Sequence, residues 1–135
     1  MVILLLLTSM ALPLARVQVQ REREAQLRRA LSEIRQAIDR HKDFADHGMI
    51  NFKGDSYGYP PDLDTLVNGV VVRGAKSKYK FLRSVPIDPM TGKADWGLRA
   101  MQDDPDSRSW SGGNVFDVYS QSQMTALDGT RFADW

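Results

Sequence analysis

The fold is decided by residues 1–44, which read MVILLLLTSMALPLARVQVQREREAQLRRALSEIRQAIDRHKDF. The first fourteen residues carry no charge, whereas residues 15–44 hold eight Arg or Lys and five Asp or Glu. Residues 16–44 contain no Gly or Pro and many strong helix formers. Residues 2–44 therefore predict one helix of about 40 residues, near 60 Å long, which must project from its domain.

The charged part of this helix carries a narrow apolar stripe. Its members recur at helical spacing and are predicted to pack on the rest of the domain: Leu27, Leu31, Ile34 and Ile38. The other faces are charged, and the pairs Glu24–Arg28 and Arg35–Asp39 have the spacing of local ion pairs. This pattern favours an amphipathic helix lying on a sheet over a basic membrane-surface helix, because acids interleave with the bases.

The apolar run is shorter than a membrane span, which needs about 20 apolar residues. No basic residue precedes it and no A-x-A site follows it, so it does not match a secretory signal peptide. The basic residues after it would favour a cytoplasmic C-terminal side if nothing lay upstream. A buried core helix is the alternative. Pro13 predicts a kink or loosened turn where the apolar part ends.

Residues 45–135 predict a small head. Gly48 is a candidate helix terminator, and residues 60–69 predict a short helix with Pro61 in its first turn and Asp62 and Asp64 complementing its dipole. Residues 70–72 could be briefly extended, residues 81–92 form a loop, and residues 96–100 and 114–120 predict strands, with a possible third at 130–132. The fold class is therefore α+β: a long N-terminal helix packed on a small antiparallel sheet.

Composition argues against most catalytic chemistry. The net charge is +1, there is no cysteine, and the only histidines are His41 and His47. Phosphate-loop, nucleophile-elbow and zinc-protease motifs are missing from the sequence. The aspartates of residues 103–106 are interpreted as turn carboxylates, and the three tryptophans (Trp96, Trp110 and Trp135) as core or interface anchors. We therefore expect no enzymatic activity and no nucleic-acid partner.

Several stretches resemble one known family. Residues 4–17, LLLLTSMALPLARV, look like the N-terminal helix of type IV pilins and type II secretion pseudopilins. Residues 59–67 (YPPDLDTLV), 85–99 (VPIDPMTGKADWGLR) and 112–135 (GGNVFDVYSQSQMTALDGTRFADW) are similar to the major pseudopilin family, general secretion pathway protein G. The helix segment alone is weakly specific for the family, whereas the later stretches are considerably more specific.

The resemblance implies a structural subunit of a pseudopilus filament. Residues 1–15 would form the membrane and filament-core part, and residues 16–135 the periplasmic head with the second half of the helix. The chain would sit in the bacterial inner membrane as a single-pass protein. Its partners would be other copies in a helical homopolymer, minor pseudopilins, an inner-membrane assembly platform, membrane lipid and a prepilin peptidase. The residues expected in the filament core are Val2, Ile3, Leu4, Leu5, Leu6, Leu7, Met10, Leu12, Pro13 and Leu14.

The sequence departs from the family pattern in two places. The basic leader, the peptidase site and the family's glutamate would lie upstream of Met1, so the sequence is expected to begin inside a longer protein. Family members commonly bind Ca²⁺ after the last main strand, but residues 120–125 (SQSQMT) offer no carboxylate before Asp128. Calcium is the one cofactor that the resemblance implies, with Asp128 as its candidate ligand.

Two alternatives stay open. A type IV pilus subunit for adhesion or motility would show the same pattern, and genomic neighbours would separate it from a pseudopilin. A membrane-anchored periplasmic binding or enzymatic domain would instead have a monomeric head with a ligand pocket.

Overall fold

A computed structural model of the chain describes the backbone of residues 2–135 and the side chains from Pro13 onward. Helix α1 (Val2–Asp46) is followed by helix α2 (Leu63–Asn68) and strands β1 (Gly97–Arg99) and β2 (Asp117–Tyr119). Two 3₁₀ turns, Gly54–Ser56 and Phe132–Asp134, complete the regular elements. The α+β class with a long N-terminal helix and a small antiparallel sheet is confirmed.

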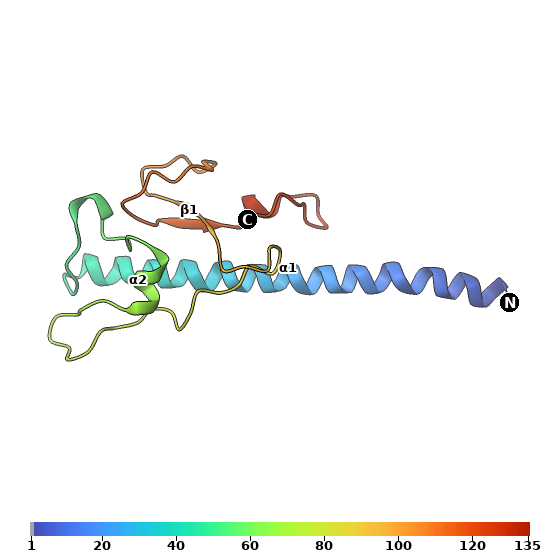
Figure 1. The fold of residues 1–135 in the computed structure, drawn as a ribbon, viewed down its shortest axis with the longest axis horizontal. Coiled ribbons are helices and arrows are strands. Elements are labelled where there is room, and N and C mark those ends of the chain that lie inside the picture. Colours follow the sequence, from blue (N-terminus) through green and yellow to red (C-terminus); the bar gives the residue numbers. More distant parts are fainter. Residues whose placement is uncertain (1) are drawn as a thin grey trace.

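Helix α1 is a single element of 45 residues, about 66 Å long at the usual rise. It runs through Pro13 as one continuous helix, and the kink or loosened turn predicted there stays a prediction (Figure 1). The helix ends two residues later than predicted, and Gly48 (φ 69°) then reverses the chain. The N–H groups of Gly48 and Met49 donate to the carbonyls of Ala45 (3.0 Å) and Phe44 (2.9 Å), which closes the last turn.

The sheet has two strands among the described residues. Strands β1 and β2 are antiparallel, with Leu98 opposite Val118. The prediction of a third strand at residues 130–132 is wrong. That segment makes one isolated bridge, between Thr125 and Arg131, and then enters the Phe132–Asp134 3₁₀ turn. Residues 70–72 likewise make one bridge, from Val70 to Tyr79.

Helix α2 is short and capped as the aspartates suggested. The carboxylate of Asp62 accepts from the backbone N–H of Thr65 at 2.7 Å, so Asp62 is the N-cap and Pro61 lies before the helix rather than in its first turn. The carbonyl of Leu66 accepts from the backbone N–H groups of Phe81 and Leu82. These bonds hold the long connection between α2 and β1 against the helix.

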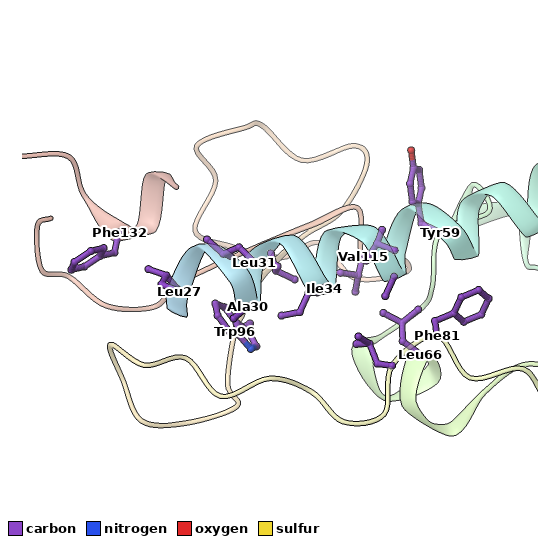
Figure 2. Packing of buried hydrophobic residues seen from close by; sticks show 14 of the residues in the cluster. Leu27, Ala30, Leu31, Ile34, Tyr59, Leu66, Phe81, Trp96, Val115 and Phe132 are labelled. Atoms are coloured by element: carbon purple, nitrogen blue, oxygen red, sulfur yellow. The ribbon is translucent and has the colours of Figure 1, made fainter. Parts of the chain in front are cut away.

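The core lies between the C-terminal part of α1 and the head. The stripe residues Leu27, Leu31, Ile34 and Ile38 are all buried, and Figure 2 shows the first three facing side chains from the head. Leu66, Phe81, Trp96, Val115 and Phe132 complete this cluster. Fully burying one such side chain stabilises a fold by about 1.5–3 kcal/mol, so the stripe attaches the head to the helix firmly.

The tryptophans occupy different environments. Trp96 is buried and its indole N–H donates to the carbonyl of Pro86 at 2.8 Å. Trp110 is 38% exposed, and its indole N–H donates to the carbonyl of Asn114. Trp135 packs on Phe132 beside the cluster. The core assignment therefore holds for Trp96, whereas Trp110 lies at the surface.

Candidate functional site

The part of α1 that extends beyond the head is the most distinctive surface of the molecule (Figure 1). Every side chain from Pro13 to Val19 is exposed, and Leu27 is the first buried side chain from Pro13 onward. Leu14 is 68% exposed and Val19 is 50% exposed. A helix of a small domain normally covers its apolar side chains, so this segment presents surface suited to packing against another molecule.

Most of the predicted filament-core residues lie before Pro13, where the structure describes the backbone but not the side chains. For Val2, Ile3, Leu4, Leu5, Leu6, Leu7, Met10 and Leu12 the structure describes a helical backbone, and their side chains lie outside the described residues. Pro13 and Leu14 are described and exposed. Within the described residues, no helix combines the length and apolarity needed to cross a membrane.

A charged band follows the apolar run. Arg16 and Arg23 are seven residues apart and lie on the same helix face, with Val19 and Gln20 between them along that face. The side-chain amide of Gln20 donates to the carboxylate of Glu24 at 3.3 Å. The band thus offers guanidinium groups directly beside apolar surface.

Three side chains of α1 fix the angle between the projecting segment and the head. The carboxylate of Glu24 accepts from the backbone N–H of Leu127 (2.8 Å), and the guanidinium of Arg28 lies 3.8 Å from the ring centroid of Trp135. Arg35 donates from Nε to the carboxylate of Asp117 (2.8 Å) and from Nη2 to two backbone carbonyls. These contacts replace the predicted local ion pairs, neither of which forms among the described residues.

The histidines differ in environment. His41 is buried against Phe81, with ring centroids 5.4 Å apart, and its Nδ1 lies 2.9 Å from the carbonyl of Gly58. A carbonyl only accepts, so Nδ1 carries the proton. Burial lowers the pKa of His41, although the Gly58 bond opposes this effect. His47 is exposed, and the carbonyl of Asp43 raises its pKa.

The turn carboxylates are held by their own loops. Asp103 accepts from the backbone N–H of Ala100 at 2.8 Å, and this bond lowers the pKa of its carboxyl group. Asp128 accepts from the hydroxyl and N–H of Thr130, and the hydroxyl bond lowers the pKa of Asp128. Both aspartates therefore serve as acceptors for local turns.

The calcium expectation does not fit these residues. Calcium takes six to eight oxygen ligands and favours carboxylates. Asp128 stands alone, because no three Asp, Glu or His side chains gather into a possible metal site in the part of the chain that the structure describes. Asp128 is thus the one carboxylate of the described residues that this expectation rests on.

Comparison of the chain with protein-family models, curated proteins and solved structures finds no match. The projecting helix and its attachment to the head are therefore the features from which a function can be inferred. Sequence periodicity indicated the apolar stripe, but nothing in the spacing indicated the contacts of Glu24, Arg28 and Arg35, whose partners lie about a hundred residues away. The expectation that the chain has no enzymatic activity stays a prediction.

Proposed function

We propose that this chain is a subunit of a helical filament, a pseudopilin of a type II protein secretion system, which polymerises through the N-terminal part of α1. The observation that carries the proposal is the length of α1 beyond the head. Residues 13–19 are exposed on all sides and leave Leu14 and Val19 uncovered. Packing against the same helix of neighbouring copies would bury this surface in every subunit.

The charge-free run at residues 1–14 supports the same proposal, because a helix apolar on every face suits lipid or a crowded helix bundle. In the proposal, subunits lie in the bacterial inner membrane before assembly, with their heads in the periplasm. An assembly platform in that membrane then adds them to the filament, and minor pseudopilins join the same helical array. The resemblance of residues 85–99 and 112–135 to the major pseudopilin family directs the choice of secretion over adhesion.

The attachment of the head is the second supporting feature. A filament repeats one geometry in every subunit, so the head must keep a constant angle to the helix. Glu24, Arg28 and Arg35 contact the C-terminal segment and β2 along one side of α1. The buried stripe adds an apolar interface along the same helix. Together these contacts make the helix and head one rigid unit.

Filament isolation tests the proposal. Filaments sheared from cells that express the chain are labelled with an antibody against the head and viewed by electron microscopy. A Leu7→Arg variant should abolish them, since an arginine within an apolar helix core costs about 2–4 kcal/mol. The matched control is Val71→Arg, which puts the same side chain at a position 71% exposed on the head.

The outcomes separate a filament subunit from a membrane-anchored binding domain. The proposal expects filaments with the unmodified chain and with Val71→Arg, and none with Leu7→Arg. Filaments that survive Leu7→Arg would contradict assembly through the helix. A chain that stays monomeric in cells containing a secretion platform would favour the anchored binding domain.

A further inference from the structure

A polar hollow of about 380 Å³ lies where the chain leaves β2. Its wall combines two guanidinium groups, one aromatic ring, two serine hydroxyls and two side-chain amides, from Arg108, Arg131, Tyr119, Ser120, Ser122, Gln121 and Gln123. These groups come from three separate stretches of the sequence. None of them belongs to the exposed segment of α1 through which the filament is proposed to assemble.

The ring of Tyr119 forms a fixed part of this wall. Tyr119 pairs with Gly97 across the sheet, and a Cβ at Gly97 would lie 2.1 Å from the ring, so the ring needs glycine at this position. The guanidinium carbons of Arg99 and Arg108 lie 4.2 Å and 4.9 Å from the ring centroid. The ring therefore holds two cations beside the hollow.

A chain of hydrogen bonds holds the loop that supplies the hydroxyls. The hydroxyl of Ser120 donates to the buried carboxylate of Asp88 at 2.6 Å and accepts from the N–H of Ser122 at 3.2 Å. The Ser122 oxygen in turn accepts from the N–H of Met124 at 3.2 Å. Ser122 lines the hollow and is 8% exposed, and its hydroxyl donates to no acceptor among the residues that the structure describes.

The charged residues that line the hollow are basic. Arg108 and Arg131 are among its lining residues and no aspartate or glutamate is, while Asp88 and Asp134 bond to residues of the wall. Asp88 is already bound by Ser120, and Asp134 pairs with Arg108 at 2.8 Å. Arg131 forms no ion pair with any residue that the structure describes. An anion would complete this arrangement, whereas a metal cation would be repelled.

We propose that the hollow binds a small oxyanion, a carboxylate or phosphate group held by Arg131 and Arg108 with the hydroxyl of Ser122 as a further donor. Planar guanidinium groups match both oxyanions, and bonds between ions are the stronger class of hydrogen bond. The oxyanion comes either from a free small molecule or from a carboxylate side chain of a second copy. This binding does not use the exposed segment of α1 through which the filament is proposed to assemble.

The test uses the whole 135-residue chain, ¹⁵N-labelled, in uncharged maltoside micelles. Inorganic phosphate and acetate are titrated separately to about 50 mM, and amide shifts of residues 119–133 are followed. We expect saturable shifts with dissociation constants of about 1–10 mM. Arg131→Gln should weaken binding by about tenfold, as loss of one charged partner implies. Arg83→Gln, which removes the same charge at another exposed position, should bind like the unmodified chain.

A dilution series separates the two sources. Shifts that grow with chain concentration and are reversed by phosphate identify a carboxylate of a second copy, and phosphate shifts at high dilution identify a free anion. Both results support the proposal. It is overturned if neither anion shifts these amides, if Arg131→Gln and Arg83→Gln bind equally, or if calcium chloride shifts the loop in place of the anions. Filament formation plays no part in any of these readouts.

Discussion

Arg35 is the side chain that joins α1 to two distant parts of the head. Its guanidinium binds the carboxylate of Asp117 on β2, the carbonyl of Val118 and the carbonyl oxygen of Trp135. The planar group reaches all three at once, which a single ammonium cannot do. We call these three bonds the Arg35 clamp. Arg35 is about one-third exposed, so solvent weakens its ion pair but leaves the geometry of the clamp intact.

Arg35→Lys should lower the free energy of unfolding by about 1–2 kcal/mol, because two of the three bonds are lost. Urea denaturation in maltoside micelles, followed by tryptophan fluorescence, measures the change. Arg40→Lys, at an exposed position of the same helix, should change stability by less than about 0.5 kcal/mol. Equal midpoints for the two variants would show that the clamp contributes nothing.

His41 should make the head sensitive to acid. Burial lowers its pKa in the folded state below the ordinary value of 6.5, so the unfolded chain binds more protons in the acidic range. The contribution of neutral His41 to the free energy of unfolding is therefore fully present above about pH 6.5. It falls as the pH drops toward the folded-state pKa. His41→Asn keeps a donor for the Gly58 carbonyl and should flatten this dependence.

His47→Asn is the matched control for the histidine prediction. The Asp43 carbonyl raises the pKa of His47, so its contribution has the opposite sign: it is present below pH 6.5 and lost as the pH rises through the folded-state pKa. Urea midpoints between about pH 5 and 8 measure both variants. An unchanged acid slope in His41→Asn would contradict the assignment.

At the scale of elements, α1 could be predicted more completely than the sheet. Its length follows from residues 16–44 lacking Gly and Pro, and its buried face follows from the spacing of Leu27, Leu31, Ile34 and Ile38. The strands are three residues each, too short for alternation to mark their ends. The segment 130–132 looked extended from composition, yet the adjacent 3₁₀ turn carries Phe132 into the core.

Pro13 lies inside α1, where it cannot donate to the carbonyl four residues earlier. We expect Pro13→Ala to restore this bond, leave the head unchanged and reduce filament yield, if the proposed assembly loosens the helix at this proline as the resemblance implies. Circular dichroism and filament yield from sheared cells measure the two effects. Full yield from Pro13→Ala with unchanged helicity would show that the proline has no role in assembly.

At the scale of the whole molecule, the sequence indicated one projecting helix and one small head, and the structure has that arrangement (Figure 1). The junction between them could not be predicted. Helical spacing predicted local partners for Glu24 and Arg35. In the structure their partners lie 103 and 82 residues away along the sequence. Local spacing favoured exposed pairs worth about 0.2–0.5 kcal/mol, and several tertiary bonds to one side chain outweigh that amount.

The hollow for which oxyanion binding is proposed was also beyond sequence reasoning. Arg108, Tyr119 and Arg131 are separated by 11 and 12 residues and meet only because β2 and the final 3₁₀ turn fold together.

The central claim is that α1 packs against α1 of neighbouring copies. Because the chain has no cysteine, single substitutions give clean crosslinking pairs. The deciding measurement mixes Leu4→Cys and Leu12→Cys chains in intact cells, oxidises the membranes and counts disulfide-linked dimers. A parallel set mixes Leu4→Cys with Lys76→Cys, whose exposed side chain is in the head. The account predicts abundant Leu4–Leu12 dimers and few in the control, and dimers no more frequent than in the control would contradict it.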